Sequence, residues 1–271
     1  MRAAALAWLG LLFAAAASAQ STPWQVEGGV GGDRLSGGRE SWSQVDFALR
    51  HRWAARSVAE ISLRQTRRSG QDDSEVAALG ALPLDANWNA SVAASLSPTH
   101  RALAREGMRL ELARALADGW VAQMGLTRRL YRSGGVADGN RQLTLGMERY
   151  AGPWRWAVAV GQTHLDSGGG AGSLRMQLDR SFADERGRIG IIAATGREVE
   201  GVAATASAPA DLIDQRVNSV ALVGTWPLAP AWALTGELAT VHYSDAQTQS
   251  ATPTGAPYRR NGLRIGVRHD F

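Results

Sequence analysis

The stretch NGLRIGVRHDF, residues 261–271, ends the chain and decides the fold. One face of an extended strand here would carry Leu263, Ile265, Val267, His269 and Phe271. The opposite face would carry Arg264, Gly266, Arg268 and Asp270. Because successive strand residues point to opposite faces, one side of this strand is apolar and the other strongly polar.

The same alternation with a period of two recurs along the chain, whereas helical periodicity is hard to find. Together with the Gly, Pro, Asn and Asp residues that punctuate the runs, it predicts about fourteen strands, with 12 or 16 as alternatives. The expected spans are 24–34, 42–52, 57–67, 75–84, 88–96, 106–116, 120–132, 140–150, 154–165, 172–182, 187–197, 214–226, 231–243 and 259–271. No proline falls in the interior of these spans, which suits a closed sheet.

The connections predict how the strands are arranged. Those after even-numbered strands are short, whereas those after odd-numbered strands are longer and rich in Gly, Ser and Asp. The longer ones include 69–74, 133–139, 167–170, 199–211 and 244–257. Short turns at one end and long loops at the other are typical of transmembrane β-barrels of bacterial outer membranes. We therefore expect an all-β, closed, antiparallel up-and-down barrel, with a soluble two-sheet protein as its rival.

Tryptophans give an independent indication of the same arrangement. Eight of them lie at strand ends beside short turns: Trp24, Trp53, Trp88, Trp120, Trp154, Trp156, Trp226 and Trp232. An indole is apolar with one hydrogen-bond donor and favours the membrane interface, so we expect an aromatic girdle at the periplasmic rim. Only Trp42 of the mature chain lies toward the long-loop end.

The first residues predict export. A basic start, an apolar run from Ala3 to Ala16 and an Ala-Ser-Ala cleavage site at 17–19 form a secretory signal peptide. We expect residues 1–19 to be removed, which leaves residues 20–271 as one outer-membrane β-barrel domain. The chain has no cysteine, and its net charge of +4 is spread without a basic block, so we expect no disulfide and no nucleic-acid partner.

The polar face of the strands defines the lumen of the expected barrel. Its charged residues are Glu27, Asp46, Arg50, Arg52, Glu60, Arg64, Arg109, Glu111, Arg129, Glu148, Arg175, Asp179, Glu237, Arg264 and Arg268. Eight are arginines and seven are acidic, so the charges nearly balance. Opposed charges could line a water-filled channel and create a transverse field. Alternatively, they could pair in ladders that fill the barrel, which the balance favours.

One histidine and one carboxylate form a candidate pair for catalytic chemistry. His164 is followed by Asp166, and a carboxylate beside a histidine can orient a general base at the rim. A solvated polar pair at a loop entrance is the simpler interpretation. The glycines near residues 28–38 have no strand-then-helix context for binding phosphate. We therefore expect no enzyme activity, no cofactor and no metal, and keep a rim hydrolase as the alternative.

The chain resembles the YaiO-like outer-membrane β-barrel family. The resemblance is clearest in ERYAGPW (148–154), a strand–Tyr-x-Gly-Pro–strand turn, and continues through THLDSGGGAGSLRMQLDR (163–180). It implies a barrel whose members have no assigned catalytic residues, some of them encoded beside surface-polysaccharide genes. The terminal Phe271 also resembles the final residue recognised by the barrel-assembly machinery. Outer-membrane lipids and that machinery are thus the implied partners.

These patterns leave three functions open. The preferred one is a non-enzymatic barrel, either a narrow channel for saccharides or other small hydrophilic solutes, or an export-associated pore. A rim hydrolase is the second. A structural or adhesive barrel whose long loops meet external partners is the third.

Overall fold

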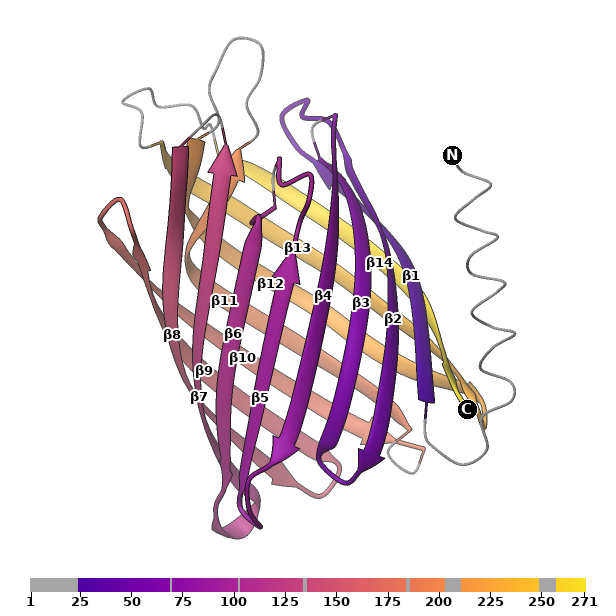
Figure 1. Cartoon of the computed structure of the whole chain (residues 1–271). Coiled ribbons are helices and arrows are strands. Elements are labelled where there is room, and N and C mark those ends of the chain that lie inside the picture. Colours follow the sequence, from indigo (N-terminus) through magenta and orange to yellow (C-terminus); the bar gives the residue numbers. More distant parts are fainter. Residues whose placement is uncertain are drawn as a thin grey trace.

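The computed structural model describes residues 24–271 except 69, 102, 134–135, 184–185, 203–210 and 249–256. The expected signal peptide lies outside the described residues. Fourteen antiparallel strands form one closed barrel, which confirms the predicted architecture (Figure 1). They are β1 (Trp24–Leu35), β2 (Trp42–Ala54), β3 (Ser57–Arg68), β4 (Gln71–Pro83), β5 (Trp88–Leu96), β6 (Glu106–Ala115), β7 (Trp120–Ser133), β8 (Val136–Ala151), β9 (Trp154–Leu165), β10 (Gly170–Phe182), β11 (Gly187–Val202), β12 (Asp211–Ala229), β13 (Trp232–Thr248) and β14 (Tyr258–Asp270).

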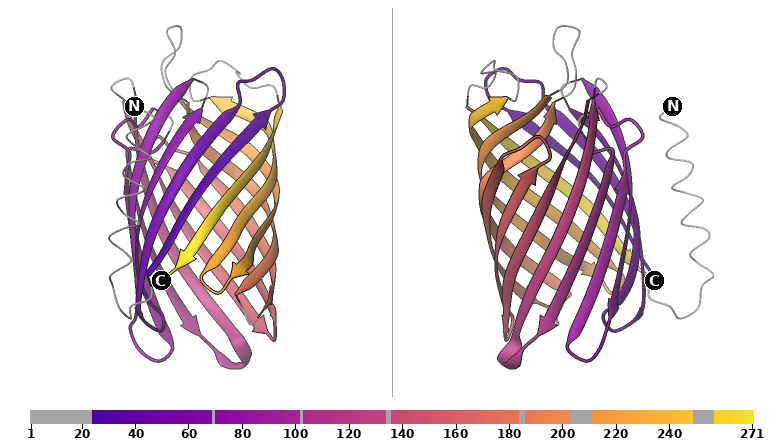
Figure 2. Two further views of the ribbon diagram at one scale, coloured as in Figure 1. Left: turned by 90° about the vertical axis from the view of Figure 1, so that its right-hand side faces the viewer. Right: turned by 60° about the vertical axis from the view of Figure 1, so that its left-hand side comes forward.

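The barrel closes where its first and last strands meet. β1 pairs with β14 from Gln25 opposite Asp270 to Leu35 opposite Arg260, so every strand has two hydrogen-bonded neighbours. In hydrocarbon, each unpaired backbone N–H or C=O group costs roughly several kcal/mol. Closure removes the sheet edges that would expose such groups. Figure 2 shows the tilted strands and this seam from two further sides.

The two faces of the sheet differ in chemistry because directly paired residues share a face. Val30, for example, pairs with Val45 and Ile265 on the outside of the barrel, and its side chain is 60% exposed. Large apolar side chains are exposed in this way on the outer positions of all fourteen strands. Such a surface is far larger than the apolar patches of soluble proteins and fits contact with lipid. No helix within the described residues is long and apolar enough to span a membrane.

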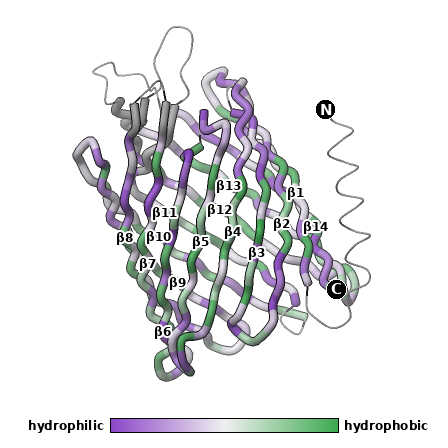
Figure 3. The backbone as a smooth tube through the Cα atoms, in the orientation of Figure 1, coloured by the Kyte–Doolittle hydropathy of each residue, from purple (hydrophilic) through white to green (hydrophobic). Residues whose placement is uncertain are grey.

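The ends of the barrel differ in the length of their connections. At the short-turn end, tight turns follow each even-numbered strand up to β12, and the turn between β6 and β7 contains a one-turn 3₁₀ helix, η1 (Ala117–Gly119). At the loop end, hydrophilic residues gather at the tips of β1 and β2 (Figure 3). Gly119 has φ +75°, and a Cβ there would collide with the carbonyl oxygen of Tyr150, so this turn requires glycine.

Several predicted boundaries at the loop end are wrong. Residues 71–74 and 136–139 belong to β4 and β8 rather than to loops, and β11, β12 and β13 extend beyond their predicted ends. Cross-strand pairing continues there past the apolar band, where alternation no longer marks it. Pro227 lies within β12, at a register irregularity that accommodates its missing N–H, so the expectation of proline-free strand interiors is also wrong.

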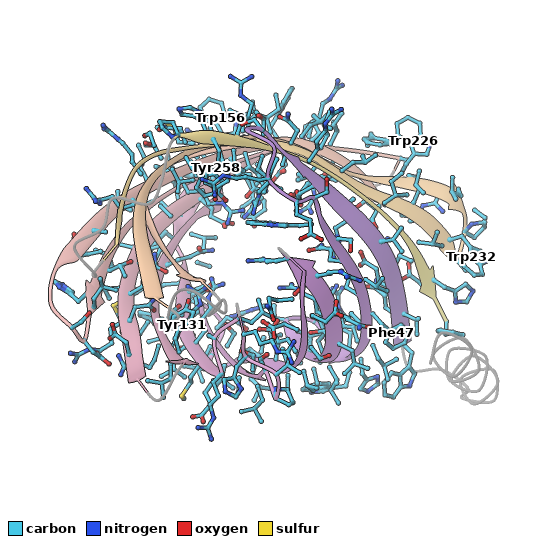
Figure 4. All side chains as sticks on the ribbon, turned by 90° about the horizontal axis from the view of Figure 1, so that it is seen from above. Phe47, Tyr131, Trp156, Trp226, Trp232 and Tyr258 are labelled. Carbon is cyan, nitrogen blue, oxygen red and sulfur yellow. The ribbon has the colours of Figure 1, made fainter. Side chains whose placement is uncertain are left out.

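The eight tryptophans of the expected girdle gather at one end of the barrel. All eight are on the outer face at the short-turn end, and Figure 4 shows Trp156, Trp226 and Trp232 projecting away from the lumen. Arginine side chains lie over three of these indoles: Arg114 over Trp88, Arg149 over Trp120 and Arg180 over Trp154. In each case the arginine is the direct cross-strand partner of the tryptophan.

Candidate functional site: the charged lumen

The lumen receives all fifteen charged residues that the sequence assigned to it. Each lies on the face opposite the exposed apolar side chains, as the register shows: Glu27, Asp46, Arg50, Arg52, Glu60, Arg64, Arg109, Glu111, Arg129, Glu148, Arg175, Asp179, Glu237, Arg264 and Arg268. Further charged residues on this face, outside that set, include Asp33, Asp73, Glu75, Arg155, Arg260 and Asp270, of which only Asp270 was expected on the polar face.

Most of these charges pair along the wall of the barrel. Arg50 on β2 contacts Glu60, its cross-strand partner on β3, at 2.5 Å. The same guanidinium donates to the Oε1 of Gln25 at 2.8 Å, and Gln25 donates to Asp270 at 2.7 Å. A continuous row of side chains therefore crosses from β14 through β1 and β2 to β3.

The most buried of these contacts centres on Arg155 of β9. Its guanidinium contacts Glu148 of β8 at 2.5 Å and Asp179 of β10 at 2.7 Å. Tyr150 also donates to Glu148, at 2.8 Å, and Gln177 donates to Asp179, at 2.9 Å. Asp179 is 1% exposed. One cation thus neutralises two buried carboxylates near the short-turn end, as removal of charge from water requires.

A second ion pair spans the seam of the barrel. Asp46 on β2 contacts Arg264 on β14, although β1 lies between these strands. The position between them is Gly29, where a Cβ would lie 3.1 Å from Asp46 Oδ2. The glycine leaves room for the two side chains to meet. Packing therefore explains a glycine at this position without any role in binding phosphate.

Two cavities occupy the lumen beside the paired charges. The cavity nearer the loop end has a volume of about 550 Å³ and is bordered by Arg64, Glu75 and Asn140. The other, which we call the inner cavity, lies nearer the short-turn end, has a volume of about 620 Å³ and is bordered by Arg109, Thr144 and Arg175, among others. Both share Arg129, Gln142 and Ser173 in their walls, so the space continues from one to the other.

Small inward side chains create this space. Gly125, Thr144, Gly146, Ala157, Ala159 and Gly161 face the inner cavity from β7, β8 and β9. The charge ladders expected to fill the barrel do form, but they lie flat along the wall. Within the described residues, the paired charges therefore leave hydrophilic space instead of filling it.

Aromatic side chains narrow the lumen on the opposite side. Leu35, Trp42, Val241, Tyr243 and Tyr258 pack together near the loop end, inside the barrel. The rings of Tyr243 and Tyr258 stack at 4.5 Å, and the guanidinium of Arg260 lies over both Trp42 and Tyr243. The sequence analysis placed Trp42 only by its end of the barrel. Trp42 lies an even number of residues from Asp46 and Arg50 on the same strand, so it could have been predicted to share their inward face.

A segment between β5 and β6 borders the cavity at the loop end. Leu103 and Ala104 contribute to its wall. The buried carboxylate of Asp73 holds the segment, because its two oxygens accept the backbone N–H groups of Arg101 and Leu103, each at 2.9 Å. The sequence analysis had placed Asp73 in a loop, so this anchor was missed.

Within the described residues, no hydrogen bond joins the candidate catalytic residues His164 and Asp166. Asp166 lies just past β9, and both of its carboxylate oxygens contact the guanidinium of Arg128. These hydrogen bonds, with the positive charge, hold the pKa of Asp166 below its usual range. His164 lies on the outer face of β9, directly opposite Arg141, which also contacts Asp166. In the part of the chain that the structure describes, no group of three or more metal-ligating side chains is placed to hold a metal ion.

Comparisons with known proteins agree on the fold alone. No family model and no curated relative matches the chain. An anion-selective porin from Comamonas acidovorans is similar in structure, with a TM-score of 0.50 and 13% identity over 93% of this chain and 99% of that one. Omp33 of Acinetobacter baumannii gives 0.47 and 11% over 93% and 100%, and the outer membrane protein OmpT of Vibrio cholerae 0.48 and 9% over 93% and 97%. The likeness to the porin, together with the closed ring of fourteen strands, shows that the chain has the barrel fold of bacterial outer-membrane proteins.

Proposed function

We propose that the protein is a non-enzymatic channel of the bacterial outer membrane that lets small hydrophilic solutes, such as saccharides, pass through its lumen. The short-turn end faces the periplasm in this proposal, and the loop end faces the exterior. The observation that carries it is the pair of adjoining hydrophilic cavities of about 550 and 620 Å³. Membership of the YaiO-like family and recognition of Phe271 by the assembly machinery stay predictions.

The charges left over from pairing support this role. Arg129 on β7 has no carboxylate partner among the described residues, and Arg175 on β10 contacts only Gln177, at 3.3 Å. On the facing wall, Glu237 has no cationic partner within the described residues, and Glu27 accepts only the hydroxyl of Thr235, at 3.1 Å. Positive and negative groups thus lie on opposite walls of the lumen, an arrangement that orients dipolar solutes.

Planar-bilayer recording tests the proposal. The purified protein should give discrete conductance steps, and Thr144→Trp should reduce their size at least about twofold because the indole enters the inner cavity. Leu145→Trp is the matched control, because Leu145 is the next residue and faces lipid. Absence of steps over a wide voltage range would refute the channel. Equal conductance of both variants would refute passage through this cavity.

A further inference from the structure

The outer face of β12, β13, β14 and β1 carries a group of basic residues at the loop end. Arg216, His242, Arg259 and Arg34 form this basic patch, and all four are exposed. His242 pairs directly with Arg259, and Arg34 pairs with Asn261, two residues further along β14. Directly opposite residues have Cβ atoms about 5 Å apart, and Arg216 and Arg34 each lie one diagonal step, about 7–8 Å, from this pair.

Several other arginines of the described rim have a carboxylate partner: Arg67 with Asp72, Arg105 with Glu106, and both Arg128 and Arg141 with Asp166. None of the four basic residues of the patch has a carboxylate partner among the residues that the structure describes. A positive region at a membrane surface attracts anionic headgroups, at about 1 kcal/mol per basic residue.

A groove lies directly beside the patch on the same outer face. Its volume is about 480 Å³, its floor includes Met176, Ala193 and Val220, and its border includes His242 and Arg259. Polar pairs mark the level at which the apolar face ends. Thr195 donates to the Oδ1 of Asn218 at 2.7 Å, and Thr240 donates to that of Asn261 at 2.9 Å. The surface is therefore amphipathic, with apolar floor below and hydrogen-bonding and cationic groups above.

We infer that this groove and the basic patch bind a phosphorylated glycolipid of the outer leaflet, the lipid A part of lipopolysaccharide. An acyl chain lies on the apolar floor, and a phosphate receives charge-assisted hydrogen bonds from Arg259, His242 and Arg34. The site lies at the loop end, which faces the exterior in the proposed orientation. We therefore assign the bound lipid to the outer leaflet. The inference depends on that location and not on solute passage, since the site lies outside the lumen.

Native mass spectrometry of the purified full-length barrel tests the inference with lipid A as the probe. Wild type should retain lipid A, and the Arg34→Gln/Arg259→Gln variant should bind it at least about tenfold more weakly. Arg67→Gln/Arg141→Gln is the matched control, because those cations are paired on the same rim. A second variant, Ala193→Trp, fills the groove without changing charge and should also weaken binding.

The outcomes separate the alternatives. Equal binding by test and control variants would overturn the site. Equal binding of phosphatidylglycerol would overturn the assignment to an outer-leaflet glycolipid, and a change of oligomeric state without lipid loss would identify the face as an interface between copies. Conductance should be unchanged in Arg34→Gln/Arg259→Gln, so failure of this inference is distinguishable from failure of the channel proposal.

Discussion

The two ends of the barrel meet their surroundings with different chemistry. At the short-turn end, eight tryptophans face outward, three of them beneath arginine side chains. At the loop end, Trp42 turns inward against Tyr243 and Tyr258, and the outward positions are amides, hydroxyls and cations. One residue type therefore has two surroundings here: the indoles are exposed on the outer face at one end, and the indole of Trp42 packs in a small core at the other.

The lumen shows a matching difference. Near the short-turn end it contains a buried charge network around Arg155, and near the loop end an aromatic cluster around Trp42. The largest expected effect comes from removing the centre of the charge network. Arg155→Met leaves Glu148 and Asp179 buried without a cation, so the free energy of unfolding should fall by about 3–5 kcal/mol. Urea titration of the refolded protein, followed by tryptophan fluorescence, measures the change.

Arg175→Met is the control for this experiment. It removes a neighbouring lumen arginine whose one described contact is Gln177, at 3.3 Å. Its unfolding free energy should stay within about 0.5 kcal/mol of wild type. If both variants lose the same stability, the network around Arg155 is not special, and the contrast between the two ends weakens.

The two kinds of tryptophan provide the next test. Trp42 is 9% exposed and Trp156 is 61% exposed. Trp42→Ala should lower the unfolding free energy by about 3 kcal/mol, because it empties part of a packed cluster. Trp156→Ala should cost roughly 1 kcal/mol, because most of its surface faces lipid. The same urea titration compares them, and a reversed order would contradict the opposite orientations of the two side chains.

The smallest expected effect concerns the turn between β4 and β5. Asp85 accepts the backbone N–H groups of Trp88 and Asn87, each at 2.7 Å, and these hydrogen bonds lower its pKa below 3.8. A lowered pKa stabilises the fold above pH 3.8, and this contribution is lost as the pH falls through the lowered value. Urea midpoints of wild type should drop more steeply below that pH than those of Asp85→Ala. Parallel curves would exclude the contribution of this carboxylate.

Strand number and most strand boundaries could be predicted because alternation is a local signal. β5 and β9 begin and end where they were expected. Apolar outward residues mark the full length of β5, whereas in β9 they stop at Val160 and polar Gln162 and His164 follow. β11, β12 and β13 were predicted too short. Their outer portions pair beyond the apolar band, where no contrast between the faces reveals a strand.

The inward face of the barrel could be predicted, but its contacts could not. Parity alone placed Glu148 and Asp179 in the lumen. Their shared partner Arg155 lies on a third strand. Its contact with both carboxylates depends on the register of β9 against β8 and β10, which the sequence does not show. Asp46 and Arg264 are further apart in sequence, and only the missing side chain of Gly29 lets them meet. The lipid-facing groove was missed because its polar residues look like ordinary strand ends.

The reach of Asp46 past Gly29 has a consequence for how the barrel closes. Ring closure joins the most distant parts of the chain, as in the contact between Gln25 and Asp270, 245 positions apart, and the entropy of bringing them together opposes the last step of folding. The ion pair between Asp46 and Arg264 connects β2 to β14 without using the backbone of the glycine-rich strand β1 between them. The ion pair thus adds a side-chain contact to the backbone hydrogen bonds that close the ring, at the place where the first and last strands meet.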